Sequence, residues 1–470
     1  MAAAGAEDGE TIMPTTHNFV PSASPARFRA GLAALALAAA VLLPARAHAQ
    51  EKPKPKKAEK TYAIRGAKIT TLAGPVIEKG NIVIRGGRIV AIGADAAIPA
   101  DAEVLDASGL EAYPGMFDAV DQIGLQEVGA VSATVDSHEL GDFNPQLNAA
   151  VAVHPASEHI PVTRAAGITH VLSAPAAGGF GGRGGVILGQ AAVINLAGWT
   201  IEEMQVRHSA AMVVNWPDFN TRSFDFSTFS IKERPFTEAK KEYDKKVQAL
   251  TDFFEEARHY QQAAEKGSAQ NFTRDLKLEA MIPVLKGELP LLILADRARE
   301  IRGAVEFCEK QKVRMILGSG ADALKVADLL KSRNVPVILG PTLRLSENED
   351  DPYDKFFTLP GDLQKKGIRF AIASYDVEFV RRLSQQAGNA VAYGLSHEDG
   401  LKAVTLYPAQ ILGLEKDLGT LETGKIANII LTTGDPLELR TEVKYLYING
   451  QPTSADNKHK QLYEKYSKRP

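Results

Sequence analysis

Residues 113–125 read YPGMFDAVDQIGL, and this stretch separates two parts of the sequence that differ in pattern. The segment before it alternates apolar and polar residues over short runs, which is typical of half-buried strands. In the segment after it, strand-like and helix-like runs alternate over about 300 residues, which predicts a parallel sheet with crossover helices. We therefore expect a small strand-rich unit, followed by a large α/β domain that opens with this stretch.

The strand-rich unit is predicted over residues 62–112. Its clearest part is NIVIRGGRIVAIG at 81–93, two strands around a Gly-Gly pair that suits a two-residue hairpin turn. Strand patterns return near the other end of the chain, within residues 419–452. Because a few strands are not stable alone, we expect the two segments to form one composite β-sandwich.

The central α/β domain is predicted over residues 113–418. The number and spacing of its strands fit a (β/α)8 TIM barrel. A charged, helical segment at about 229–280 predicts an insertion at the barrel rim. The expected strands are 167–172, 291–294, 314–317, 336–339 and 369–373, and the expected helices are 298–310, 323–332 and 377–386.

The amino terminus has the pattern of a secretory signal peptide. Arg27 and Arg29 precede an apolar run at 30–43, and Ala47-His48-Ala49 fits an A-x-A cleavage site. The run is shorter than the ~20 apolar residues that span a bilayer, which favours cleavage over anchoring. We predict that residues 1–49 are removed and that the mature protein is exported, to a bacterial periplasm in the simplest case.

Two further segments lie outside the folded domains in this interpretation. Residues 50–61 are rich in Lys and Pro and predict an extended linker, and residues 453–470 form a basic tail. Both Met1 and Met13 are candidates for the residue at which translation starts.

Composition excludes several classes of site and partner. The single cysteine, Cys308, excludes an intrachain disulfide and a multi-cysteine zinc site, and its amphipathic surroundings indicate a buried thiol. The net charge of −3 gives no indication of a nucleic-acid partner. After signal cleavage no remaining segment is long and apolar enough to span a membrane.

Several motifs together resemble the amidohydrolase superfamily. The opening stretch resembles the Pro-Gly-apolar-apolar-Asp-Ala-His-x-His signature that begins the barrel of that family. GGRIVAIG at 86–93, RAAGIT at 164–169 and LGTLETGK at 418–425 resemble its other conserved segments. The branch resembled is imidazolonepropionase-like and dihydroorotase-like, so the resemblance implies a TIM barrel that hydrolyses non-peptide C–N bonds in amides and cyclic amides.

The resemblance also implies a divalent metal, whose ligands this sequence lacks. In the family, four histidines and one aspartate at the barrel mouth hold the metal that activates water. Valine and leucine cannot ligate a metal, and glutamine is a weak neutral ligand, so we expect no metal and no other cofactor. The residues at the family's ligand positions are Val120, Gln122, Leu294, Ser319 and Tyr375.

Other residues offer groups for a rebuilt site. Asp376, Asp296 and Asp121 lie next to or near the replaced positions and are candidate catalytic carboxylates. The loop after the first barrel strand holds a further acidic and histidine cluster from His138 to His159. Prolines 145 and 155 argue against a continuous helix there, so we favour a polar loop over a relocated metal site.

Two hypotheses for function remain. In the first, the protein has lost metal-dependent catalysis and is a binding or partner subunit, with a homologous amidohydrolase subunit, a second copy of itself or a small-molecule ligand as its partner. In the second, it hydrolyses amide or cyclic amide C–N bonds with a rearranged acid/base site or with zinc or another divalent metal. The sequence favours the first, because every expected ligand position is replaced.

Overall fold

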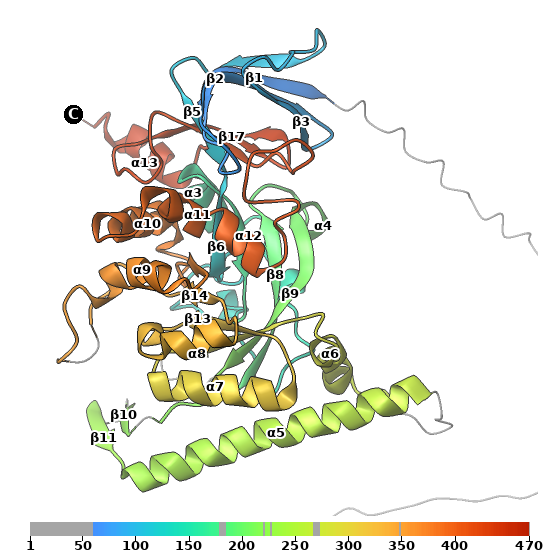
Figure 1. Cartoon of the computed structure of the whole chain (residues 1–470), viewed down its shortest axis with the longest axis vertical. Helices are drawn as coiled ribbons and strands as arrows, with labels where there is room; N and C mark the ends of the chain where they lie inside the picture. The colour runs from blue at the N-terminus through green and yellow to red at the C-terminus, as the bar shows by residue number, and fades with distance from the viewer. Residues whose placement is uncertain are drawn as a thin grey trace, which may run out of the picture. The chain divides into compact units, whose positions relative to one another are not determined.

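The protein is described by a computed structural model (Figure 1). The structure describes residues 60–177, 185–219, 221–225, 228–266, 273–346 and 349–469. The predicted leader at 1–49 and the predicted linker as far as residue 59 lie outside these residues. Residues 59–470 form one compact unit. Within the described ranges, no helix has the length and apolar character needed to cross a membrane.

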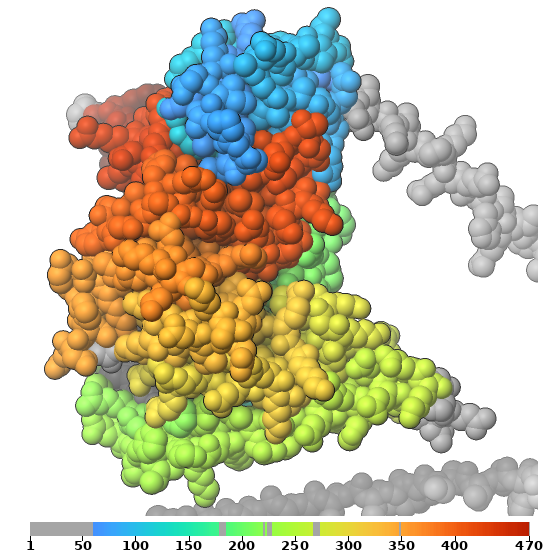
Figure 2. Space-filling model, viewed as in Figure 1, coloured from blue at the N-terminus to red at the C-terminus, as the bar shows by residue number. Residues whose placement is uncertain are grey.

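Strands from both ends of the chain form one eight-stranded sheet, as expected from the sequence. The order is β18-β17-β16-β5-β1-β2-β3, with β4 also paired to β1. The two ends join where β16 pairs antiparallel with β5, and Figure 2 shows the first and last parts of the described chain side by side. The strands are β1 Thr61–Ile69, β2 Ile77–Arg85, β3 Arg88–Gly93, β4 Glu103–Asp106, β5 Glu111–Pro114, β16 Ile429–Thr432, β17 Val443–Ile448 and β18 Gln451–Thr453.

A second eight-stranded sheet forms the TIM-like barrel. Its order is β15-β14-β13-β12-β9-β8-β7-β6. The two edge strands meet, because the backbone N–H of Tyr375, just after β15, donates to the Val120 carbonyl of β6 at 3.0 Å. The strands are β6 Met116–Asp121, β7 Ile168–Ser173, β8 Ile187–Asn195, β9 Gln205–Asn215, β12 Leu291–Ala295, β13 Met315–Ser319, β14 Val337–Leu339 and β15 Phe370–Ile372.

The barrel sheet is not entirely parallel, which corrects the sequence prediction. Strand β8 runs antiparallel to both β7 and β9. Only nine residues, 196–204, connect β8 to β9, and they include the short helix α4 Ile201–Met204. Antiparallel neighbours can be joined by a short turn, whereas parallel strands need a longer crossover. The local connection therefore accounts for the reversed strand.

Helices cover the outside of the barrel, and helices occupy or overlap the three predicted segments 298–310, 323–332 and 377–386. Helix α11 begins at a side-chain cap, with the Ser396 hydroxyl accepting the N–H of Asp399 at 3.2 Å. The remaining helices of this part, including three short 3-10 helices, are η1 Ser132–Thr134, α2 Ala149–Ala152, α3 His159–Ala165, α7 Ala298–Gln311, η2 Ala323–Val326, α8 Ala327–Ser332, α9 Lys355–Lys366, η3 Val380–Arg382, α10 Leu383–Ala392, α11 His397–Ala403, α12 Leu406–Ile411 and α13 Lys458–Tyr466.

The predicted insertion at 229–280 contains a long helix, α5 Phe236–Lys266, and the first half of the next helix, α6 Leu276–Leu285. A hairpin of β10 Arg222–Asp225 and β11 Ser230–Glu233 leads into α5. The ring of Phe254 in α5 meets that of Phe307 in α7 edge to face, with 5.2 Å between the ring centres. The insertion is therefore packed onto the barrel helices, and Figure 1 shows α5 running along the outside of the barrel.

The single cysteine lies in helix α7. Cys308 is buried, and this burial raises the pKa of its thiol to about 12. A thiol in this environment remains protonated at neutral pH and is a poor nucleophile. The structure therefore assigns Cys308 to the packing of α7, in agreement with the sequence.

Candidate functional site

A cavity of about 740 Å³ lies at the carboxyl ends of the barrel strands. Active sites of TIM barrels lie at this face, and the volume is in the range of small-molecule sites. Four of the five replaced ligand positions line the cavity, namely Val120, Gln122, Leu294 and Tyr375. The fifth, Ser319, does not line it but is bonded to Tyr375 through its backbone.

Apolar packing fills the part of the barrel below this cavity. Val120, with 2% of its surface exposed, belongs to the same apolar cluster as Val213 and Ile316. Leu294 and Tyr375 pack against that cluster. A Cβ atom at Gly318 would lie 2.6 Å from a methyl carbon of Leu294 and 3.2 Å from the Tyr375 hydroxyl. Glycine at this position therefore leaves the space that the two larger side chains use.

The side chain of Tyr375 crosses the barrel to β13 and β14. Its hydroxyl accepts the backbone N–H of Ser319 at 2.8 Å and donates to the carbonyl of Ile338 at 2.8 Å. Burial raises the pKa of the phenol well above its ordinary value. Both Tyr375 and Ser319 have positive φ, +57° and +68°, which non-glycine residues adopt rarely. The hydroxyl is thus neutral and bonded to backbone on two sides.

These residues do not fit the divalent metal that the fold family implies. Val120 and Leu294 have no donor atom, and the hydroxyl of Tyr375 is engaged by backbone groups. The Ser319 hydroxyl donates to Asp296 at 2.7 Å. Across the described ranges, no group of three or more His, Cys, Asp or Glu side chains is arranged to hold a metal ion. Of the five replaced positions, Gln122 alone brings a ligating side-chain atom to the cavity apart from the engaged Tyr375 hydroxyl, and one neutral amide does not make a metal site.

Of the three candidate carboxylates, only Asp376 lines the mouth cavity. Its Oδ1 accepts the backbone N–H groups of Glu378 and Phe379 at 2.7 and 3.2 Å. Asp296 accepts the N–H of Ala321 at 3.0 Å as well as the Ser319 hydroxyl, and it borders a separate cavity of about 240 Å³. Asp376 is therefore the one candidate that meets a ligand in the cavity of about 740 Å³, whereas Asp296 borders the smaller one.

Asp121 is fully buried where β6 meets β15. Its carboxylate accepts the Ser374 hydroxyl at 2.7 Å and the Ile123 N–H at 2.5 Å. The neighbouring Asp118 accepts the backbone N–H of Ser374 at 3.1 Å. Burial raises the pKa of Asp121 to about 6, and burial together with the charge of Asp121 raises the pKa of Asp118 well above its usual value. Asp121 thus helps to close the barrel and does not reach the cavity.

Comparison with known proteins identifies the fold. The amidohydrolase family profile matches residues 314–453. An amidohydrolase from Thermotoga maritima superposes with a TM-score of 0.72 at 24% identity, over 84% of this chain and 99% of that one. The resemblance to the amidohydrolase superfamily is confirmed. A prolidase complexed with N-methylphosphonate-L-proline has a TM-score of 0.50 at 15% identity, covering 84% of this chain and 100% of its own. Phenylurea hydrolase B has a TM-score of 0.52 at 13% identity, covering 84% and 97%.

The loop after β6 of this amidohydrolase fold supplies one histidine to the cavity. His138 lines it, and its Nδ1 lies 3.4 Å from the Ser137 hydroxyl. His159 instead opens helix α3, with Nε2 2.9 Å from the carbonyl oxygen of Glu127. The cluster predicted from His138 to His159 is therefore spread along the loop.

Sequence reasoning missed several residues of this site. Ser137 and Gln126 both line the cavity, and Ser374 bridges the two buried aspartates. Their only signal in the sequence is position, since each follows a barrel strand on the side where active sites lie. Polar residues are common in such loops, so position alone did not distinguish these three.

Proposed function

We propose that this protein is an exported amidohydrolase-fold protein that has lost metal-dependent hydrolysis and acts as a binding or partner subunit. One observation carries the proposal. Tyr375 takes the position of the family's aspartate, and its hydroxyl is bonded to Ser319 and Ile338 across the barrel. A group held in this way cannot act as general base for a water molecule, and its neighbours Val120 and Leu294 offer no ligand.

The lining of the mouth cavity suggests the kind of ligand. Val213 and Leu294 give it apolar walls, and Gln122, Gln126 and Asp376 add hydrogen-bonding groups. Ser132, Ser137 and His138 also line the cavity, so its wall combines apolar side chains with several polar groups, as a small-molecule site does. We infer a small organic ligand that donates hydrogen bonds to the carboxylate and amide oxygens.

The export and partner parts of the proposal rest on the sequence. The charged and apolar pattern before residue 49 is the basis for export to the periplasm. A homologous amidohydrolase subunit or a second copy of this chain would be the partner. Purification of the mature protein from periplasm, with mass spectrometry of its first residues and of co-eluting chains, tests both parts.

The central test is metal content together with turnover. The mature protein, dialysed against a weak chelator, should contain no stoichiometric zinc, iron or manganese by elemental mass spectrometry. It should not hydrolyse a cyclic amide such as hydantoin, a dipeptide ending in proline or a phenylurea. Stoichiometric metal with turnover of any of these would overturn the loss of catalysis.

Ligand binding is tested by blocking the cavity. Ala176 lines it and is half-buried, so Ala176→Trp should abolish stabilisation by any small molecule found in a thermal-shift screen. Ala97→Trp, at an exposed position in the loop between β3 and β4, is the matched control and should keep the response. If Ala176→Trp also kept it, the ligand would bind elsewhere.

The alternative, an active hydrolase with a rearranged site, is favoured by the placement of Asp376 and His138 on the same cavity. A carboxylate and an imidazole can serve as general base and general acid for amide hydrolysis. In that case Asp376→Asn should abolish turnover, whereas Asp95→Asn, at an exposed position in the loop between β3 and β4, should not. Turnover that survives Asp376→Asn would remove Asp376 from the mechanism.

A further inference from the structure

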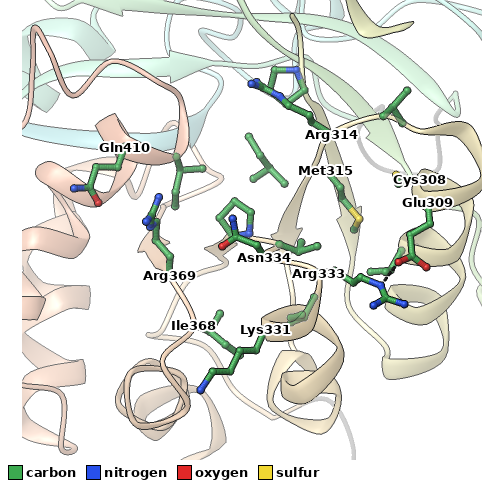
Figure 3. Close-up of a pocket in the computed structure, with 18 of the residues that line it drawn as sticks. Cys308, Glu309, Arg314, Met315, Lys331, Arg333, Asn334, Ile368, Arg369 and Gln410 are labelled. Atoms are coloured by element: carbon green, nitrogen blue, oxygen red, sulfur yellow. Dashed lines mark ion pairs between the residues drawn. The ribbon is translucent and has the colours of Figure 1, made fainter. Parts of the chain in front are cut away.

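A second cavity, of about 660 Å³, opens at the opposite ends of the barrel strands (Figure 3). Pro290, Arg314, Pro336 and Arg369, which directly precede β12, β13, β14 and β15, all line it. It therefore lies at the amino ends of these strands, away from the mouth cavity. We call it the basic basin after its five cationic residues, which are Lys312, Arg314, Lys331, Arg333 and Arg369.

Positive charge dominates the basic basin. Glu309 is the one carboxylate that lines it, and it forms an ion pair with Arg333. In Figure 3 Arg333 is turned toward Glu309, whereas Arg314 and Arg369 border the hollow itself. Within the described part of the chain, neither Arg314 nor Arg369 makes an ion pair. An open hollow with several unneutralised cations favours an anionic ligand.

Helix ends explain only some of these cations. Helices α7, α8 and α9 finish near the basin, and the carboxyl end of a helix carries about half a negative charge that nearby cations stabilise. Lys312 follows α7, Lys331 lies in the last turn of α8, and Arg333 follows it. Arg314 and Arg369 are different, because each directly precedes a strand and belongs to no helix. These two arginines need another explanation.

The rest of the lining is apolar. Met315, Ile316, Ile368 and Ile411 line the basin below the charged groups, and each has no more than 9% of its surface exposed. The neutral amides of Asn334 and Gln410 complete the rim. A ligand that fits would therefore combine an anionic group with an apolar body, at a size usual for small-molecule sites.

We propose that the basic basin binds a small organic phosphate. The planar guanidinium groups of Arg314 and Arg369 suit the paired oxygens of a phosphate, and a doubly charged group matches two arginines better than a single carboxylate does. The apolar body of the ligand lies on Ile316, Ile368 and Ile411. This site is separate from the mouth cavity and does not depend on the function proposed for it.

Calorimetric titration at low ionic strength tests the proposal on the full mature chain. Phenyl phosphate should bind, and inorganic phosphate should bind more weakly because it leaves the apolar floor uncovered. The double variant Arg314→Gln/Arg369→Gln should lower the affinity for phenyl phosphate about tenfold or more, the loss expected from removing charged hydrogen bonds. Arg302→Gln, an exposed arginine of α7 outside the basin, is the control and should bind like wild type.

Three outcomes would overturn the proposal. The first is no binding of phenyl phosphate to a protein that is folded by circular dichroism. In the second, Arg302→Gln weakens binding as much as the double variant, which would indicate general attraction to a basic surface. In the third, the protein binds phosphatidylglycerol vesicles but no soluble phosphate, and the basin would then be a lipid-surface contact.

Discussion

Tyr375 shows how a single residue changes the chemistry that a barrel of this fold can perform. A carboxylate at this place can hold a metal or accept a proton from water, whereas a neutral phenol at ordinary pH can do neither. The phenol ring also adds apolar volume, which Val120 and Leu294 extend across the barrel. The replacements therefore support one another, because each apolar neighbour makes a charged group at the next position more costly.

The hydroxyl of Tyr375 should contribute measurably to stability. Tyr375→Phe removes the partner of the Ser319 N–H and of the Ile338 carbonyl. We expect the free energy of unfolding to fall by about 1–3 kcal/mol, measured by urea denaturation. Tyr353→Phe is the control, since Tyr353 is 77% exposed, and it should leave stability unchanged. Equal midpoints for Tyr375→Phe and wild type would contradict this role of the hydroxyl.

The buried aspartates predict a pH dependence of stability. Burial raises the pKa of Asp121 to about 6, so the folded protein holds this proton more tightly than the unfolded chain does. Protonated Asp121 therefore contributes its full stabilisation below about pH 4. This contribution, about 3 kcal/mol, is lost as the pH rises through about 6.

Asp121→Asn should reduce that dependence, although the buried Asp118 still titrates in the variant. Asparagine can still accept the Ile123 N–H and bond the Ser374 hydroxyl, but it does not titrate. The free energy of unfolding should therefore decrease less between pH 4 and pH 7 for the variant than for wild type. Asp95→Asn, at an exposed position, should follow wild type. The idea fails if Asp121→Asn and wild type lose the same stability between the two pH values.

The sequence could predict that the replaced ligand positions lie close together, but not which residues they form hydrogen bonds with. Val120, Gln122, Leu294 and Tyr375 each lie within three residues of the carboxyl end of a barrel strand, and barrel topology alone brings such residues together. The bonds of Tyr375 reach residues 56 and 37 positions away. Those bonds depend on a left-handed backbone at Tyr375, which nothing in a run of Ala-Ser-Tyr-Asp indicates.

At the level of elements, strand direction was the feature that the sequence could not reveal. The apolar run in β8 identifies a buried strand, but the same run serves a parallel and an antiparallel neighbour equally well. The predicted helix α7 was easier, because its apolar spacing is a local signal. Direction follows from the short connection after β8, whose path is a tertiary property.

Helix α5 should be part of the cooperative fold. Phe254 is fully buried against Phe307, and its removal leaves a cavity between α5 and α7. We expect Phe254→Ala to lower the free energy of unfolding by about 3–5 kcal/mol in urea denaturation. Phe236→Ala on the same helix, where the side chain is 49% exposed, should cost much less. Similar small losses for both variants would indicate that α5 unfolds separately from the barrel.

At the level of the whole molecule, the terminal sheet and the barrel share packing. Ile430 of β16 belongs to the same apolar cluster as Met116 of the barrel. The buried amide of Asn428 donates to Asn195 in β8 at 2.9 Å and lies 3.2 Å from the ring nitrogen of His170 in β7. Burial lowers the pKa of His170 to about 3, so this histidine is neutral at ordinary pH. Polar and apolar contacts thus both join the sheet to the barrel.

Because of this shared packing, the sheet and the barrel should unfold together. Both tryptophans of the chain, Trp199 and Trp216, lie in the barrel region, so their fluorescence reports on the barrel. A variant with both changed to Phe and with Tyr445→Trp, on an exposed position of β17, reports on the sheet. In urea, we expect the fluorescence midpoint of each protein to equal the midpoint of its own circular-dichroism transition. The barrel and the sheet would then unfold in one transition. Since β5 and β16 come from opposite ends of the chain, pairing them before the barrel forms would cost the entropy of closing a very long loop. A sheet transition at a distinctly lower urea concentration than the barrel transition would show that the barrel stays folded without the terminal sheet.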